Sequence, residues 1–420
     1  MTRATLLAAP VLAAPFLAAL LLPLAARAAD PISILAFAPP GGTVDRSGKA
    51  DASAALAGAI AAANVFTAKG EPACVVIPPG RYRISTPPPA FIRAGCVRGD
   101  GPTQSELVLD ETFTGDLFAW SEAWKPTTPG PTAVGLKITG TRTARGPQNA
   151  LVFYDRNDEV FLDQIVVNDL PGRALYSGVM KHVPQAYMRE SHMRSLRFFN
   201  DGAPGLPVVE FSSEGTGKTD ATNQIRLSQV DIYGAHGPGF VIRNNGEGGV
   251  RAITAESLRI EGTENGTVAA DLLTIGDPVM RGRVFSITFT NLELIDPYAG
   301  FAALRMTAAP GAPVPYHITA QGAIGGGLPH GEGLRIDAGR NSDFQFSAIH
   351  TEGPNVVTGP RASKIVLDGY GNDACWIYRA DSAMTHSKQI IILDGEKTRD
   401  PSGVTHESTT LKPTGCPNLP

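Results

Sequence analysis

The stretch ACVVIPPGRYRIS, from Ala73 to Ser85, contains two short apolar runs on either side of a Pro-Pro-Gly corner. Pro78 and Pro79 fix φ and lack amide donors, while Gly80 permits a tight change of direction. Each flanking run is rich in residues that favour extended backbone. The stretch therefore predicts a strand, a rigid corner and a second strand.

An alanine-rich segment directly before this corner is the only helix that we predict. It reads ADASAALAGAIAAANV, residues 50–65, and Leu56 and Ile60 are four residues apart on one helical face. We expect the side chain of Asp51 to cap its N-terminus. After this segment the helical period ends, and short alternating strands with polar corners follow.

Eight segments of similar pattern recur after residue 130, with starts about thirty residues apart, which is within the range of solenoid repeats. They begin at Ala133, Glu159, Tyr187, Asn223, Val250, Val284, Tyr316 and Asp343. Each has a strand, a polar corner, a second strand and a further turn. None could bury its apolar face alone, so we expect stacked coils to form the core.

The succession KADASAALAGAIAAA, CVVIPPGRYRI and CVRGDGPTQSELVL resembles the N-terminal region of the pectate-lyase-like superfamily. The motif covers Val44 to Asp110, and the coil pattern extends less specifically to about Ile392. The resemblance implies an all-β fold, a right-handed single-stranded parallel β-helix, closed at its N-terminal end by the helix. Members include lyases, glycoside hydrolases, epimerases and phage tailspikes, so the resemblance does not define a reaction.

The N-terminus has the features of an export signal. Arg3 precedes a Leu/Ala-rich run, and Ala26, Arg27 and Ala28 form a small-residue cleavage pattern. We expect residues 1–28 to be removed and the mature chain to be secreted or periplasmic. Residues 29–420 then form one domain, with the cap at about 44–72, coils at about 73–392 and a tail at 393–420. Prolines interrupt the run, so stable membrane insertion is not expected.

Charge and cysteine content narrow the class of protein. The 36 basic and 40 acidic residues give a net charge of −4, and basic blocks are absent, which argues against a nucleic-acid partner. Four cysteines in an exported chain indicate two disulfides with three possible connectivities. We favour pairing of the neighbours, Cys74 with Cys96 and Cys375 with Cys416. Their spacing does not suggest a metal site.

Polar residues follow the first strand of each unit and, in stacked coils, would form a row at strand spacing. A row of acids, aromatic rings and imidazoles suits a polysaccharide groove, and two carboxyl groups about 5 to 9.5 Å apart can hydrolyse a glycosidic bond. We predict Asp201, Glu261 and Asp296 as catalytic acids. The predicted substrate-binding residues are Tyr233, His236, Glu264, Tyr298, His350 and Glu352.

These residues favour an exported enzyme that cuts an extracellular or cell-envelope polysaccharide by acid/base hydrolysis without a cofactor. Elimination on a uronate polymer is the first alternative. It would use a base such as Lys181 or His182, and calcium could neutralise the uronate carboxylate. A uronate epimerase and a non-catalytic polysaccharide-binding solenoid are the others. The sequence does not define the sugar, the coil register or the oligomeric state.

Overall fold

The computed structural model describes residues 31–337, with gaps at 93–94, 122–129, 219–220, 263–267, 269, 281, 299, 310–311, 313–314 and 325–330. Beyond residue 337 it describes only the backbone of the strands at 342–351, 355–358, 363–368, 371–372, 376–379 and 389–393. Within these ranges no helix is long and apolar enough to cross a membrane.

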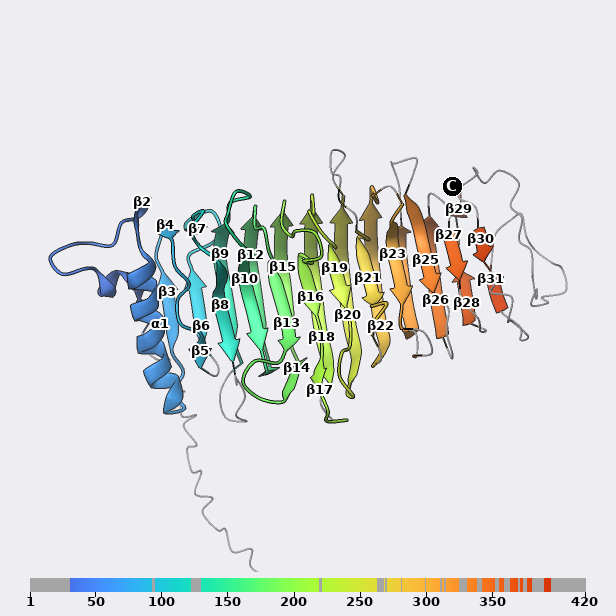
Figure 1. Ribbon diagram of the computed structural model, residues 1–420, viewed down its shortest axis with the longest axis horizontal. Helices are drawn as coiled ribbons and strands as arrows, with labels where there is room; N and C mark the ends of the chain where they lie inside the picture. Colours follow the sequence, from blue (N-terminus) through green and yellow to red (C-terminus); the bar gives the residue numbers. More distant parts are fainter. Residues whose placement is uncertain are drawn as a thin grey trace, which may run out of the picture.

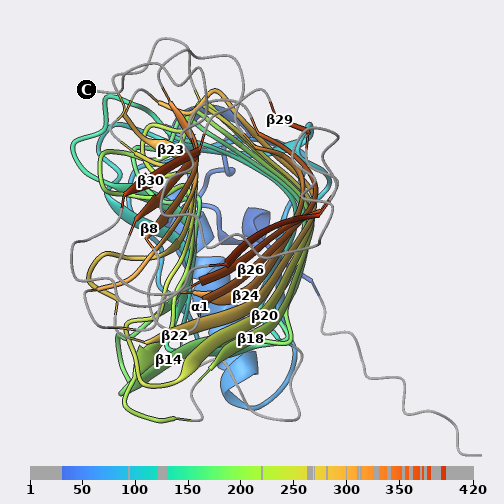
Figure 2. The same ribbon diagram turned by 90° about the vertical axis from the view of Figure 1, so that its right-hand side faces the viewer.

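The chain forms a right-handed parallel β-helix, as the sequence predicted. Figure 1 shows the coils stacked side by side along the long axis, and Figure 2 looks along that axis. Sheet A contains the long coil strands β9 (Thr132–Thr139), β12 (Phe161–Asn168), β15 (His192–Phe199), β18 (Thr222–Tyr233), β20 (Gly249–Glu261), β22 (Arg283–Ile295), β24 (Tyr316–Ile324) and β26 (Ser342–Thr351). These eight strands correspond to the eight units predicted from the sequence.

The second sheet, sheet B, forms the opposite wall and contains eleven parallel strands. They are β5 (Phe91–Ile92), β8 (Gly115–Ser121), β10 (Gln148–Tyr154), β13 (Leu175–Val179), β16 (Val209–Phe211), β19 (Phe240–Ile242), β21 (Leu273–Gly276), β23 (Ala302–Thr307), β25 (Glu332–Asp337), β27 (Asn355–Thr358) and β30 (Trp376–Arg379). Each coil thus crosses from sheet A to sheet B and back.

Shorter strands complete sheet A at its ends and edges. They are β1 (Ile32–Ser33), β2 (Ser47–Asp51), β3 (Cys74–Ile77), β4 (Gly80–Ile84), β6 (Cys96–Gly99), β7 (Ser105–Leu109), β11 (Arg156–Asp158), β14 (Gln185–Arg189), β17 (Glu214–Gly215), β28 (Ser363–Asp368), β29 (Gly371–Asn372) and β31 (Gln389–Leu393). β14 pairs with β11 and precedes β15 in the same coil.

The core fills the space between the two sheets. On β18, Ile225, Leu227, Val230 and Ile232 are buried, whereas the residues between them point outward. This alternation follows from the two-residue period of a strand. Because every coil repeats it, the outward side chains form columns that run along the solenoid.

Helix α1 (Ser53–Ala68) lies across the first coil and buries Leu56 and Ile60, as predicted (Figure 1). A 3-10 helix, η1 (Ile34–Phe37), packs beside it. The helix begins two residues after Asp51, with Ala52 as its N-cap. The Asp51 carboxylate nevertheless accepts a hydrogen bond of 3.0 Å from the backbone N–H of Ser53 and a second from Ser85, so it ties the cap to the end of β4.

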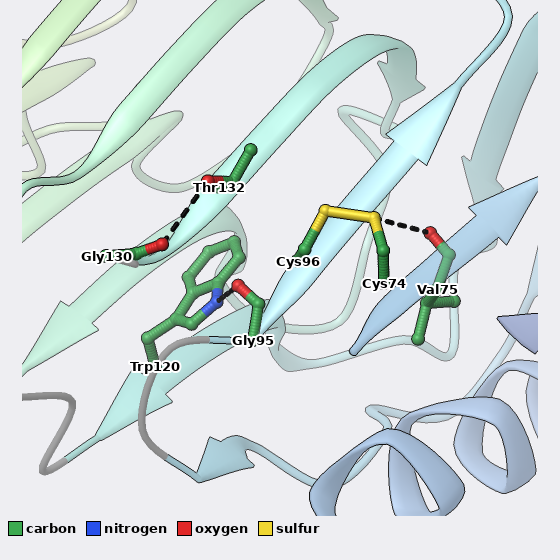
Figure 3. Close-up of a disulfide and its surroundings, with 7 residues drawn as sticks. All are labelled: Cys74, Val75, Gly95, Cys96, Trp120, Gly130 and Thr132. Carbon is green, nitrogen blue, oxygen red and sulfur yellow. Dashed lines mark hydrogen bonds between the residues drawn. A yellow bond between two sulfur atoms is a disulfide. The ribbon is translucent and has the colours of Figure 1, made fainter. Parts of the chain in front are cut away.

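The Pro-Pro-Gly corner joins β3 to β4, as predicted. Gly80 has a φ of +152°, and a Cβ atom there would lie 2.9 Å from the Cβ of Arg46. Figure 3 shows the disulfide between Cys74 and Cys96, which are in-register partners on β3 and β6. This pairing is confirmed, whereas Cys375 and Cys416 lie outside the described residues. The corner and the disulfide both belong to the first coils and their cap.

Candidate functional site

Six consecutive coils bend sharply just before their buried run in sheet A. At this bend each coil has one residue other than glycine with a left-handed backbone, with φ between 49° and 56°, and the register places all six in one column. The six are Glu159, Glu190, Gln224, Ala252, Ser286 and His317. Such backbone is uncommon for these residue types, so its repetition marks a regular corner of the solenoid.

A hollow of about 560 Å³ lies on the outer surface at this corner. Its lining comes from three coils and consists of Glu190, His192, Gln224, Arg226, Ala252 and Thr254. His192, Arg226 and Thr254 are in register on β15, β18 and β20 and point outward because their neighbours point into the core. The hollow thus spans adjacent coils, as a site for an extended polymer would.

The charged side chains of this hollow have no ion pairs among the described residues. Glu190 presents a carboxylate, His192 an imidazole and Arg226 a guanidinium. Two residues further along β15 the situation differs, because Arg194 pairs with Asp163 at 2.8 Å. The hollow therefore offers an acid, a titratable base and a cation to a ligand.

Asp158, on the coil before Glu190, adds a carboxyl group of different character. It is in register with Arg189, the residue that precedes Glu190, and it is only 6% exposed. Burial is the main cause that raises the pKa of Asp158 to about 6. The positive charge of Arg189 lowers this pKa, and the negative charges of Glu190 and Glu159 raise it further. Asp158 thus retains its proton at a pH where an exposed carboxyl would have lost it.

The sequence-predicted residues Tyr233 and Glu261 lie side by side at the ends of β18 and β20, as register partners. Arg259 donates a 2.9 Å hydrogen bond to Glu261 and contacts Glu293 at 3.5 Å, so two carboxylates share one guanidinium. The ring of Tyr233 is stacked on Phe199 at 5.4 Å, and the Arg259 guanidinium lies 4.9 Å from its centre. Both faces of this ring are therefore occupied.

Asp201, the first predicted catalytic acid, is 1% exposed. One carboxyl oxygen accepts a 2.8 Å hydrogen bond from the backbone N–H of Leu170, and burial raises the pKa of Asp201 well above its usual value. The backbone N–H of His236 donates to the Asp201 carbonyl at 2.8 Å. Burial, together with the charge of Arg142, lowers the pKa of the His236 imidazole. Asp201 is thus enclosed in the corner, and its carboxyl does not reach the surface.

The remaining predicted residues are spread along the same corner. Asp296 follows β22 with a left-handed φ of 53° and is partly buried. Tyr298 is 3% exposed and its hydroxyl donates to the Ala235 carbonyl, so its ring belongs to the core. His350 lies on β26, of which only the backbone is described. Glu264 and Glu352 lie outside the described residues.

His182, named above as a possible base, is held by a buried carboxylate. Asp155 is fully buried and accepts backbone hydrogen bonds from Lys181 at 2.7 Å and His182 at 2.8 Å. Its other oxygen lies 3.0 Å from His182 Nδ1 and accepts from the Ser121 hydroxyl at 2.7 Å. Burial alone would raise the pKa of Asp155, but these hydrogen bonds outweigh it and lower the pKa. Asp155 therefore holds the turn that contains His182 in place through these hydrogen bonds.

Because the predicted row consists of residues that follow strands, Asp158, Glu190, His192 and Arg226 were not predicted from the sequence. These residues stand where the coil strands begin, in the sequences NDEV and RESH and at Arg226. An acid directly before the buried run in two successive coils, Glu159 and Glu190, was the available signal. The described residues hold no group of three His, Cys, Asp or Glu side chains suited to a metal ion. Calcium therefore stays a prediction tied to the lyase alternative.

Comparison with solved structures gives remote likenesses. No protein-family model and no curated protein matches the chain. Among solved structures, the A-module of the mannuronan C-5 epimerase AlgE4 from Azotobacter vinelandii is 14% identical, with a TM-score of 0.43 over 87% of this chain and 100% of that one. An alpha-1,3-glucanase from Streptomyces thermodiastaticus is 16% identical, with a TM-score of 0.36 over 82% and 69%.

A phage protein shows a similar likeness. The tailspike of the Acinetobacter phage vB_ApiP_P1 is 12% identical, with a TM-score of 0.43 over 93% of this chain and 65% of that one. This chain also covers 62% of ORF18 of Geobacillus virus E2, at 12% identity and a TM-score of 0.42. At such values a shared activity does not follow, so the function has to be argued from the hollow and its side chains.

Proposed function

We propose that this chain is an exported carbohydrate-active enzyme that cuts an extracellular or cell-envelope polysaccharide by acid/base glycoside hydrolysis. The observation that carries the proposal is the hollow at the start of the coil strands. Glu190 lines this hollow with an exposed carboxylate, and a buried carboxyl group with a raised pKa, Asp158, lies one coil away from it. Two carboxyl groups in different protonation states are what glycoside hydrolysis requires.

In this proposal Asp158 gives its proton to the leaving glycosidic oxygen, and Glu190 acts on the opposite side of the sugar as base or nucleophile. Adjacent coils are about 4.8 Å apart, so carboxyl groups on neighbouring coils fall within the range that such enzymes use. Gln224 and Thr254 present an amide and a hydroxyl that suit sugar hydroxyl groups. The residues that line the hollow come from three coils, which suits a polymer better than a single sugar.

The sequence-predicted Glu261 belongs to a second possible arrangement, with Glu293 as its partner. Both carboxylates contact the Arg259 guanidinium, at 2.9 Å and 3.5 Å, so each already has a side-chain partner. Asp201 and Asp296 stay predictions of the same kind. We therefore use Glu261 as the matched control for Glu190, since it is a glutamate at the opposite end of the strands of sheet A.

The experiment is a screen of the mature protein against neutral and acidic polysaccharides, with chain length as the readout. On a polymer that is cut, we expect Asp158→Asn and Glu190→Gln to lower kcat about 10² to 10⁴-fold with binding retained, whereas Glu261→Gln stays near wild type. If only Glu261→Gln lost activity, the active site would lie at the ends of the strands instead. Unsaturated, ultraviolet-absorbing products would show elimination in place of hydrolysis.

Polymer binding by every variant without any cleavage would contradict the enzyme proposal and support a polysaccharide-binding solenoid. Solvent deuterium entering an intact uronate polymer would indicate epimerisation. Each outcome selects one of the alternatives that the sequence left open.

A further inference from the structure

The outward arginines of sheet A fall into two groups according to their partners. Two on β15 face carboxylates: Arg194 contacts Asp163 at 2.8 Å, and Arg197 contacts Asp231 at 3.6 Å. Arg226, in the hollow, has no ion pair among the described residues. A cation left without a partner inside a hollow, on a face where others are paired, is a candidate for pairing with a ligand.

We propose that the polysaccharide bound in the hollow is anionic and that Arg226 pairs with its charged group, a uronate carboxylate or a sulfate ester. This inference rests on the proposed function and adds the charge of the substrate to it. A guanidinium presents a planar fork of donors that matches the paired oxygens of a carboxylate or sulfate. A neutral sugar would use only part of this capacity.

A second cation lies on the next coil. Arg251 directly precedes Ala252, which lines the hollow, and its guanidinium is 5.9 Å from the ring centre of Phe285 with no carboxylate partner among the described residues. Arg226 and Arg251 belong to the adjacent strands β18 and β20, where Arg226 is in register with Thr254 and Arg251 with Asn223, so the two cations lie three residues out of register. An acidic chain that crosses the two coils could therefore contact both cations.

The acids near this hollow are compatible with an anionic ligand. Glu190 lines it and Glu159 stands one coil earlier in the same column, while Asp158 is buried and keeps its proton up to a pH of about 6. Glu190 stands at the bend, whereas Arg226 and His192 stand two residues beyond it. The acid and the cation therefore line different parts of the hollow. A charged substituent at Arg226 would thus fix the register of the sugar against Glu190.

The inference is tested by binding, independently of turnover. Oligomers of a uronic acid, the same oligomers as neutral methyl esters, and a sulfated oligosaccharide of similar length are titrated calorimetrically into the mature protein. We expect the wild type to prefer the free acid over its ester by at least about tenfold, and Arg226→Gln to lose this preference. The matched control is Arg197→Gln, an outward arginine that already has a carboxylate partner and should keep the preference.

Preference for the sulfated oligosaccharide over the uronate would assign the anion to sulfate, and the reverse to carboxylate. Equal affinity for acid and ester, no binding of either anionic probe, or an unchanged preference in Arg226→Gln would overturn the inference. If a neutral polymer is nevertheless cut and Glu190→Gln abolishes the cleavage, the proposed function stands while the anionic substrate is excluded. The two proposals therefore fail separately.

Discussion

The two ends of the long strands in sheet A carry similar residue types in very different states. Where the strands end, Arg259 holds Glu261 and Glu293, Tyr233 is covered on both faces, and Asp201 is buried. Where they begin, Glu190, His192 and Arg226 face an open hollow without ion pairs among the described residues. Charged residues that form ion pairs with one another stabilise the corner. Those without such partners are available to bind a ligand.

Because of this difference, we expect substitutions at the two ends to have different effects. Substitution at the strand ends should change the free energy of unfolding and leave turnover intact. Substitution at the strand starts should change turnover and leave the fold intact or more stable. Natural sites often carry groups that are unfavourable for the fold because function requires them.

The largest effect on stability is expected at Asp158, and it is a gain. Because the folded state holds the proton more tightly than the unfolded chain, the wild type is favoured below about pH 4 and loses stability as pH rises through about 6. Asp158→Asn removes this loss. We expect the free energy of unfolding to increase by up to about 3 kcal/mol above pH 6, with no gain at pH 4.

Urea denaturation at pH 4, 6 and 8 measures this gain in stability. The activity assay on the same preparations measures the accompanying loss of turnover. A variant that is more stable at pH 8 and inactive would mark Asp158 as a functional residue. A variant that is less stable at every pH would mean that Asp158 serves the corner, as Asp201 does, and the distinction between the two strand ends would not hold.

The sequence predicted the fold well because each coil repeats the same local rules. The Pro-Pro-Gly corner at Pro78 to Gly80, the buried pair Leu56 and Ile60 and the eight recurring units are all present as expected. Alternation along a strand decides which side chains enter the core, and it can be read directly from residues such as Ile225 and Leu227. The pairing of Cys74 with Cys96 follows because the register makes them neighbours.

The site was harder to predict because it depends on which outward residues find partners in other coils. Asp201 and Glu190 look alike in a sequence, yet one is enclosed by the corner and the other is exposed. Their difference arises from neighbours about thirty residues away, such as Leu170 for Asp201. Only the register reveals that Arg259 has two carboxylates within reach and that Arg226 has none among the described residues.

A smaller effect, and a loss, is expected at Asp201. Its carboxyl oxygen accepts the backbone N–H of Leu170 inside the corner, so Asp201→Ala leaves that donor buried without a partner. We expect the free energy of unfolding to fall by about 1 to 3 kcal/mol in urea denaturation. Asp201→Asn keeps an oxygen for this N–H and removes the buried carboxyl group whose pKa is raised, so it should not share this loss. If Asp201→Asn retains the fold but loses turnover, Asp201 is catalytic after all.

The smallest effect is expected at Arg259, although it has more partners than any other residue in this comparison. Its side chain is 37% exposed, and Glu261 and Glu293 are 30% and 49% exposed, so water screens these ion pairs. Exposed pairs contribute little, and we expect Arg259→Gln to lower the free energy of unfolding by less than about 1 kcal/mol. Turnover should remain within about twofold of wild type, because the residues assigned to catalysis stand at the other end of the strand. A large drop in kcat for Arg259→Gln with an unchanged unfolding curve would instead place the chemistry beside Tyr233, since freeing the two glutamates there would have altered an active carboxylate pair.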